Sequence, residues 1–188
     1  MLTLRISSGT AKNKKLKLPN IENFRAVQEI AKQAIFSIIA DKINNARCLD
    51  LFAGSGNMGI EALSRGAEWC DFVDSHYEAI TTIEQNLFNC GFSDKAAIHQ
   101  KDAAKFAAAA VSSTNDKYDL IFMDPFYEDT AQVYLLKQVD KVLTDNGLAF
   151  MLYGSKLNIA TIIKDTNLEV VTTRRFGATH FSELRHKA

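Results

Sequence analysis

From residue 47 onward the chain alternates between short apolar runs and longer amphipathic segments. The short runs are rich in Val, Ile, Leu and Phe and have the length of buried strands. The longer segments have the 3.6-residue period of helices, as at Ile80, Ile83, Leu87 and Phe88. This alternation predicts a parallel sheet with crossover helices. The predicted strands are 47–52, 69–73, 97–100, 119–123 and 147–152, and the predicted helices are 57–65, 77–90, 103–111, 130–143 and 156–165.

The two ends of the chain have other patterns. Residues 168–173 and 180–184 are strand-like, and the six residues between them are too few for a parallel crossover, so they predict an antiparallel hairpin at the sheet edge. Residues 2–18 predict a basic strand–turn–strand. Residues 28–39 predict a helix, and its apolar face is expected to contain Ile30, Ala34, Ile35 and Ile38.

Five parallel strands closed by a hairpin are the arrangement of class I methyltransferases. We therefore expect one Rossmann-like α/β domain over 1–188, with a seven-stranded, mostly parallel sheet. Within it we expect an N-terminal extension at 1–40 and a core at 46–188. A fold alone does not establish a function.

Composition narrows the class of protein. The chain has 188 residues, of which 47% are hydrophobic and 23% charged, as in ordinary globular domains. Its three cysteines, Cys48, Cys70 and Cys90, are widely spaced in apolar segments, which favours buried reduced thiols over disulfides or a zinc site. Apolar runs fall short of the ~20 residues of a membrane helix, and the N-terminus does not have a secretory pattern. These features predict a cytoplasmic protein without a metal.

The net charge is zero, but basic and acidic residues are unevenly distributed along the chain. Residues 1–32 contain seven basic and two acidic residues, and residues 170–188 contain four and one. The segment between them contains eleven basic and nineteen acidic residues. A basic N-terminus beside an acidic body is expected of a surface that meets an anionic partner, and a solvated lysine-rich hairpin has the same pattern.

A glycine-rich segment follows the first predicted strand and opens a helix. Gly54, Gly56 and Gly59 match G-x-G-x-x-G, the fingerprint of a loop that brings a ligand close to a helix N-terminus. Asp74 ends the next predicted strand, where an acidic side chain can accept hydrogen bonds from ribose hydroxyls. These residues predict an adenosine-type ligand.

Two further acids bear on the identity of that ligand. Asp50 lies at the mouth of the loop, where a carboxylate would repel a pyrophosphate but suits the cationic end of S-adenosylmethionine. Asp102 follows the third predicted strand and is placed to accept a hydrogen bond from the adenine amine, to cap the next helix, or to do both. S-adenosylmethionine is therefore preferred to NAD.

The fourth predicted strand ends in Asp124-Pro125-Phe126-Tyr127. This tetrapeptide resembles the (Asp/Asn)-Pro-Pro-(Tyr/Phe) motif of methyltransferases that act on exocyclic amines of adenine or guanine. Such an amine is a weak nucleophile, and acceptors at Asp124 and near Pro125 would hold its N–H groups for in-line attack. Tyr127 would stack on a base that has left its own stack. An Asp-Pro turn with no catalytic role has the same pattern.

The sequence is similar to the bacterial guanine-N2 methyltransferases of small-subunit ribosomal RNA over nearly its whole length. The closest matches are Leu-Asp-Leu-Phe-Ala-Gly-Ser-Gly at 49–56 and Gly-Ile-Glu-Ala-Leu-Ser-Arg-Gly-Ala at 59–67. Segments 4–9 and 14–19 resemble the opening hairpin of the family, 25–36 its first helix and 175–179 its ending.

This resemblance implies a site for each ligand. The implied S-adenosylmethionine pocket is formed by Asp50, Phe52, Gly54, Gly56, Asp74, Ser75, Asp102 and Ala103. The implied base pocket is formed by Asp124, Pro125, Phe126 and Tyr127. The implied RNA contacts are Arg5, Lys12, Lys14, Lys15, Lys17 and Arg25. The implied partner is ribosomal RNA, within the small ribosomal subunit as it assembles, and we expect a monomer.

The chain departs from the family pattern at two places. It has Arg25-Ala26-Val27 where the family has Arg-Pro-Thr, and Phe126 where the family has a second proline. Three alternatives therefore stay open: an N6-adenine methyltransferase on RNA or DNA, a non-catalytic relative that binds S-adenosylmethionine or RNA, and an NAD-dependent oxidoreductase.

Overall fold

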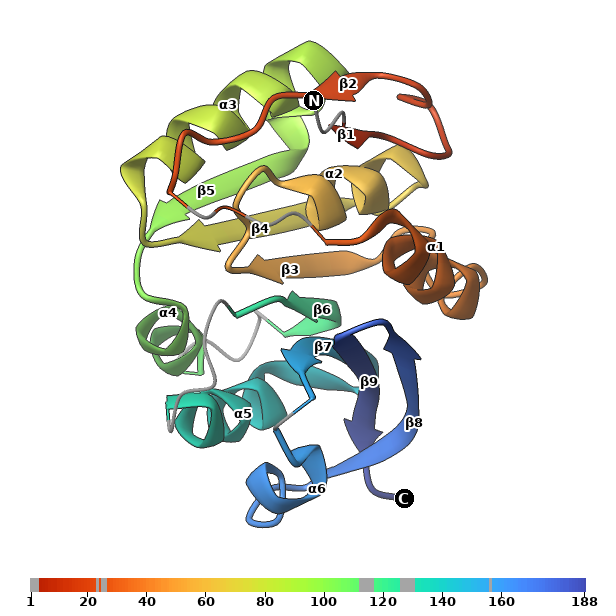
Figure 1. Ribbon diagram of the computed structural model, residues 1–188, viewed down its shortest axis with the longest axis vertical. Coiled ribbons are helices and arrows are strands. Elements are labelled where there is room, and N and C mark those ends of the chain that lie inside the picture. Colours follow the sequence, from red (N-terminus) through yellow and green to blue (C-terminus); the bar gives the residue numbers. More distant parts are fainter. Residues whose placement is uncertain (1–3, 23, 25–26, 112–116, 126–130, 156) are drawn as a thin grey trace.

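A twisted seven-stranded sheet runs through the middle of the computed structural model (Figure 1). The structure describes residues 4–22, 24, 27–111, 117–125, 131–155 and 157–188. The strand order is β5-β4-β3-β6-β7-β9-β8, in which β3 to β7 are parallel and β8 and β9 are antiparallel. The strands of this sheet are β3 (Arg47–Leu51), β4 (Trp69–Asp74), β5 (Ala96–Gln100), β6 (Tyr118–Met123), β7 (Leu143–Gly154), β8 (Leu168–Phe176) and β9 (Thr179–His186).

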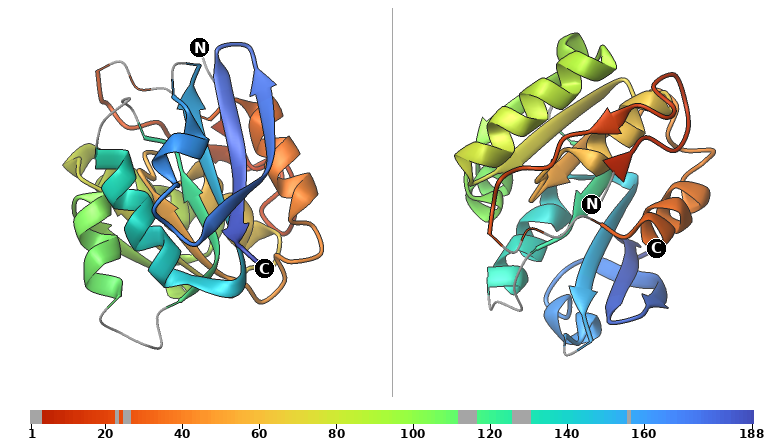
Figure 2. Two further views of the ribbon diagram at one scale, coloured as in Figure 1. Left: turned by 90° about the horizontal axis from the view of Figure 1, so that it is seen from below. Right: turned by 45° about the horizontal axis from the view of Figure 1, so that its top comes forward.

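Helices cover both faces of the sheet (Figure 2). The helices are α1 (Glu29–Ile38), α2 (Asn57–Ser64), α3 (Tyr77–Cys90), the 3-10 helix η1 (Ser93–Lys95), α4 (Ala103–Ala110), α5 (Ala131–Val142) and α6 (Ile159–Ile162). Because successive strand residues point to opposite faces, Cys48 and Phe122 pack toward α1, α2 and α3, while Leu49 and Ile121 pack toward α4, α5 and α6. Burial on both faces explains why these strands are almost continuously apolar.

The N-terminal extension is built into the same core. Strands β1 (Leu4–Arg5) and β2 (Lys15–Leu16) form a two-stranded antiparallel ribbon, as predicted. The side chains of Leu4 and Leu16 are buried with those of α1, α2 and α3. The ribbon lies along α3 and next to α2 (Figures 1 and 2), where the Ala11 N–H donates to Ser64 Oγ over 2.9 Å.

The sheet and the C-terminal hairpin are confirmed, but several predicted boundaries are wrong. Strand β8 runs to Phe176 and β9 begins at Thr179, so two residues join them and not six. Strand β7 begins at Leu143 and not at 147, because Leu143 pairs with Tyr118 before the register shifts to Leu120 and Leu148. The helix predicted over 156–165 is only the four-residue α6. The Asn158 side chain caps its start, and Thr166 Oγ1 donates to the Ile163 carbonyl after its end, so polar side chains close the helix on both sides.

The apolar faces predicted for two helices are also partly wrong. In α1 the buried residues are Ala31, Lys32, Ile35 and Phe36, while Ile30 is 59% exposed. In α3 the side chain of Phe88 is 77% exposed, although it shares the predicted apolar period. In α1 a charged side chain is buried and an apolar one is exposed, the reverse of what the sequence pattern predicts. A buried ion pair lets the lysine occupy the core.

The three cysteines are free and buried, as predicted. Burial is the main cause that raises the pKa of each of these thiols. Across the described part of the chain, every helix is too short or too polar to cross a membrane. The described residues also contain no group of three or more His, Cys, Asp or Glu side chains placed to hold a metal ion.

Candidate functional site

The loop between β3 and α2 contains three residues in the left-handed backbone region. Phe52 has φ 60°, Gly54 has φ 55° and Gly56 has φ 76°. A side chain at Gly54 would place Cβ 2.8 Å from the ring of Phe24, and one at Gly59 would place it 2.3 Å from the ring of Phe72 on β4. The glycines are therefore required by the sharp turn, by the approach of Phe24 and by close packing of α2 on the sheet.

Two buried carboxylates hold this loop in place. The backbone N–H of Gly59 donates to Asp50 Oδ2 over 2.9 Å, and that of Gly54 donates to Asp74 Oδ2 over 2.9 Å. The other oxygen of Asp74 accepts from the N–H of His76 and lies 3.1 Å from His76 Nδ1. In this structure both acids therefore bind the backbone of the segment that was predicted to meet the cofactor.

A shallow cleft opens at the carboxyl ends of β3 and β6. These strands are neighbours, but the chain passes from β3 to β4 on the other side, so the cleft lies at the topological switch point of the sheet. Its lining is formed by Phe24, Val27, Asp50, Phe52, Ala53, Gly54, Ser55, Asn57, Met58, Phe122, Met123, Asp124 and Leu152. Ligands of open α/β sheets bind at such a crevice.

The cleft is mainly apolar, with an acidic pair in its lining. Burial is the largest cause that raises the pKa of Asp50 to about 8, and the charges of Asp124 and Asp74 raise it further against the hydrogen bond from Gly59. Asp50 is therefore mostly protonated at neutral pH. A cation bound beside it would favour its ionised form.

Three of the eight predicted cofactor residues, Asp50, Phe52 and Gly54, line the cleft. The other five, Gly56, Asp74, Ser75, Asp102 and Ala103, lie outside its lining. Asp74 ends β4, and Asp102 follows β5, so both lie along the same carboxyl edge of the sheet as Asp50. Asp102 Oδ1 accepts from the Lys105 N–H over 2.9 Å, which makes it the N-cap of α4.

The predicted base pocket is described only in part. Asp124 follows β6 and is half-buried. It lines the cleft from β6, while the glycine loop lines it from the neighbouring strand β3. Pro125 is also half-buried. Phe126 and Tyr127 lie outside the described residues.

The predicted RNA contacts lie on the surface of the β1–β2 ribbon. All five that the structure describes are exposed, namely Arg5, Lys12, Lys14, Lys15 and Lys17. Two of these lysines also bind α3, since Lys14 Nζ donates to the Asn89 carbonyl and Lys17 Nζ donates to Gln85 Oε1 over 2.9 Å. Arg25 lies outside the described residues.

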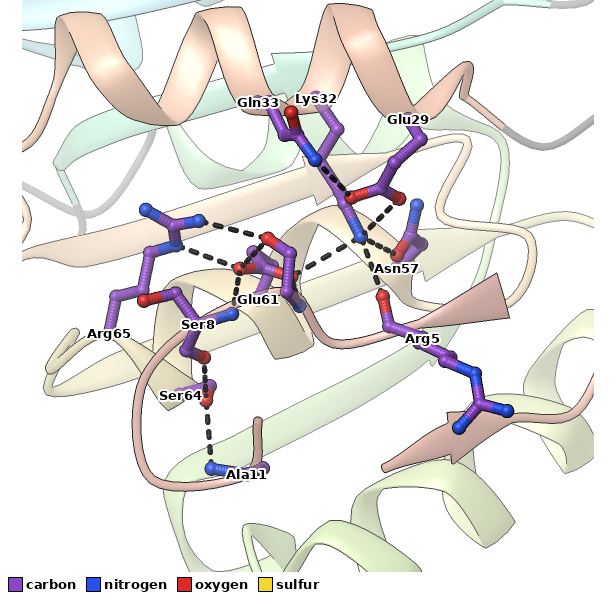
Figure 3. Close-up of polar contacts among 11 residues, drawn as sticks. Arg5, Ser8, Ala11, Glu29, Lys32, Gln33, Asn57, Glu61, Ser64 and Arg65 are labelled. Carbon is purple, nitrogen blue, oxygen red and sulfur yellow. Dashed lines mark hydrogen bonds and ion pairs between the residues drawn. The ribbon is translucent and has the colours of Figure 1, made fainter. Parts of the chain in front are cut away.

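Sequence reasoning missed a buried lysine that joins the extension to the helix of the glycine loop (Figure 3). Lys32 of α1 is fully buried. Its Nζ donates to the Arg5 carbonyl over 2.8 Å and to Asn57 Oδ1 over 3.1 Å. It also forms ion pairs with Glu29, at 3.0 Å, and with Glu61, at 3.3 Å.

Glu61 of α2 is the acidic centre of this network. It accepts hydrogen bonds from Ser7 N and Oγ and from Ser8 N, and it pairs with Arg65 Nε at 2.8 Å. Burial alone would raise the pKa of Glu61, but the hydrogen bonds from Ser7, the Lys32 charge and Arg65 outweigh it, and the pKa is lowered. The sequence held only a weak signal of this pair, a lysine on the otherwise apolar face of a helix.

Comparison with known proteins identifies the family of the chain. Residues 4–185 match the family described as conserved hypothetical protein 95. The chain belongs to this family. It is 33% identical over 174 residues to YlbH of Bacillus subtilis (strain 168), which is provisionally named an rRNA methyltransferase, and the match covers 92% of each chain. It is 28% identical over 144 residues to ribosomal RNA small subunit methyltransferase D of Escherichia coli (strain K12), over 77% of this chain and 68% of that one.

Solved structures agree on the fold. The E. coli protein yhhF, provisionally named a methyltransferase, superposes with a TM-score of 0.81 at 20% identity, over 100% of this chain and 99% of that one. SMU.776, also provisionally named a methyltransferase and solved in complex with SAH, gives a TM-score of 0.68 at 12% identity, over 84% of this chain and 50% of that one. The fold of this family member is the Rossmann-like methyltransferase fold, as predicted.

Proposed function

We propose that this protein transfers a methyl group from S-adenosylmethionine to an exocyclic amine of a base in ribosomal RNA, specifically N2 of a guanine in the small subunit. The observation that carries the proposal is the cleft, which joins the glycine loop and Asp50 of β3 to Asp124 of β6. Relatives named as rRNA methyltransferases support ribosomal RNA as the substrate. The choice of guanine N2 rests on the resemblance of the sequence to guanine-N2 methyltransferases.

The residues of the cleft fit S-adenosylmethionine. A bound cation would ionise Asp50, so this side chain favours a cationic ligand over the pyrophosphate of NAD. Asp50 would then pair with the cationic end of the cofactor, while Asp74 and Asp102, farther along the same edge, would meet its ribose and adenine.

Asp124 has the chemistry that methylation of an amine requires. When bound, S-adenosylmethionine supplies a methyl group whose bond to the sulfonium sulfur breaks as the amine nitrogen attacks, with the electron pair staying on sulfur. An exocyclic amine is a weak nucleophile, because its lone pair is delocalised into the ring. A carboxylate that accepts an N–H hydrogen bond orients the nitrogen, and the same carboxylate can take the proton that the nitrogen must lose.

The exposed lysines of the β1–β2 ribbon would bind the phosphate backbone of the substrate. Lys12, Lys14, Lys15 and Lys17 lie on one small ribbon, and phosphate contacts of this kind position an RNA without reading its sequence. Specificity for one guanine would then come from the shape of the RNA and from the residues around Asp124.

The proposal is tested by Asp124→Ala in parallel with Asp145→Ala, whose side chain is 93% exposed. Cofactor affinity is measured by calorimetry, and labelled methyl transfer is measured on unmodified small ribosomal subunits. We expect Asp124→Ala to keep cofactor binding and to slow transfer by at least about 100-fold, the scale of a positioned acid–base group. Asp145→Ala should transfer at the wild-type rate. Wild-type turnover by Asp124→Ala would overturn the assignment.

A further inference from the structure

The side-chain amide of Asn57 has an unused donor beside the cleft. Asn57 is the first residue of α2, directly after Gly56, and it lines the cleft with only 4% of its surface exposed. Its Oδ1 accepts a hydrogen bond from Lys32 Nζ over 3.1 Å. Its Nδ2 is buried and, among the residues that the structure describes, has no hydrogen-bond partner.

Lys32 fixes which way this amide faces. An ammonium group only donates hydrogen bonds, so it can bind the oxygen of the amide but not its nitrogen. Lys32 itself is held by the Arg5 carbonyl and by the carboxylates of Glu29 and Glu61 (Figure 3). A flip of the amide would place its NH₂ group against a buried ammonium. The donor Nδ2 is therefore turned away from Lys32.

A buried donor of this kind calls for an acceptor. Buried polar groups in native proteins are almost always hydrogen-bonded, so this donor calls for an acceptor, and its place in the lining of the cleft makes a ligand group one candidate. The N-terminus of an α-helix also favours negative charge, and Asn57 lies at that end of the eight-residue α2. The acceptor that fits this position best is an anion.

The proposed cofactor brings one suitable group to this place. Its nucleoside is expected toward β4 and β5, where Asp74 and Asp102 lie, so its amino-acid end would occupy the cleft between β3 and β6. That end has an ammonium group, which suits Asp50, and a carboxylate. The carboxylate is its only anionic acceptor.

We propose that Asn57 Nδ2 donates a hydrogen bond to the carboxylate of S-adenosylmethionine, and that Lys32 is the positioning residue that keeps the donor turned toward it. This inference rests on the proposed function, because it takes the cofactor from there. It gives the N-terminal extension a part in cofactor binding, since α1 supplies Lys32 and β1 supplies the Arg5 carbonyl that holds it.

The test compares two ligands that differ in one group. Decarboxylated S-adenosylmethionine keeps the nucleoside, the sulfonium and the ammonium and lacks only the carboxylate. The affinity of each ligand is measured by calorimetry for the wild type, Asn57→Ala and Asn57→Asp. Asn57→Asp keeps an oxygen for Lys32 and replaces the donor by an acceptor. Asn89→Asp, on the exposed side of α3, is the control for the change in net charge.

We expect both Asn57 variants to bind S-adenosylmethionine about 10- to 100-fold more weakly, the scale of a lost hydrogen bond to a charged group. Their affinity for the decarboxylated ligand should not fall below that of the wild type. Thermal unfolding of Asn57→Asp should match that of the wild type, because its contact with Lys32 remains.

Two results would overturn the inference while leaving the proposed function intact: unchanged affinity of the Asn57 variants for S-adenosylmethionine, or an equal loss for both ligands. If the wild type bound neither ligand, the proposed function itself would fail, and the inference with it.

Discussion

Replacing Glu61 by glutamine keeps the shape of the side chain and removes one negative charge from a fully buried position. The carboxylate accepts hydrogen bonds from the N–H groups of Ser7 and Ser8, from Ser7 Oγ and from Arg65 Nε, and it pairs with Lys32. A glutamine offers one acceptor oxygen in place of two. Its NH₂ group would face donors, and Lys32 would stay buried with Glu29 as its only acidic partner among the described residues.

The expected loss of stability is large. Breaking a buried ion pair by removing one partner costs about 3–5 kcal/mol. For a chain of this size each kcal/mol shifts the melting temperature by about 2–4 °C, so Glu61→Gln is expected to melt about 6–20 °C below the wild type. Glu169→Gln is the matched control, because Glu169 pairs with Arg185 at 2.8 Å on the surface, where such a pair contributes only about 0–1 kcal/mol.

The loss should also depend on pH. Because the pKa of Glu61 is lowered in the folded protein, its contribution to stability is present above the ordinary glutamate pKa and is lost as pH falls through the folded value. The difference in unfolding free energy between wild type and Glu61→Gln should therefore be greatest near neutral pH. It should narrow as the pH falls below about 4.

Circular dichroism during thermal and urea unfolding, over a series of pH values, measures both effects. A melting temperature at neutral pH within about 2 °C of the wild type would refute the reasoning, because the shift would then be that of a surface pair. A difference that stayed constant into the acid range would show that the charge of Glu61 is not its cause.

Three further predictions concern ligands. The pKa of Asp50 is raised to about 8, mainly by burial, so binding of a cationic cofactor should release a proton below that pH and strengthen as pH rises to it. Measured by calorimetry, the cofactor affinity of Asp50→Asn should no longer change with pH. A wild-type affinity that is flat between about pH 6 and 8 would contradict the prediction. Asp74→Ala should weaken cofactor binding by about 1.5–3 kcal/mol, and unchanged affinity in the same assay would remove Asp74 from the site. Glutamine at Lys14, Lys15 and Lys17 together should lower the slope of RNA affinity against salt by about 2, at ~0.7 for each phosphate contact, and an unchanged slope would exclude the ribbon as an RNA contact.

The sequence predicted those parts of the fold that depend on local patterns. The strands around Cys48 and Ile121 are apolar on both faces. Such a pattern is typical of a parallel sheet covered by helices on both sides. The glycine loop was also predictable, because the turn at Gly56 and the packing of Gly59 are requirements of the backbone itself. A register shift such as that between Tyr118 and Leu120 has no such local pattern, and the start of β7 was misplaced.

Contacts between distant residues were not predictable in this way. Lys32 is buried beside Glu61, and its place on the apolar face of a helix was only a weak signal that did not identify this partner. Lys32 also orients the amide of Asn57, and that contact had no local signal either. Asp102 was predictable in part, since a helix cap was one of its two local roles and the structure contains that cap. Its contact with adenine stays a prediction. All assignments of residues to the cofactor, the base and the RNA stay predictions, and Phe126, Tyr127 and Arg25 also lie outside the described residues.

The central claim is the identity of the methylated group. It is tested most directly by transferring labelled methyl from S-adenosylmethionine to unmodified small ribosomal subunits and to their extracted RNA, followed by nucleoside analysis of the product. We predict N2-methylguanosine with the wild type and none with Asp124→Ala. N6-methyladenosine in its place, or no transfer by a wild-type protein that binds the cofactor, would contradict the account.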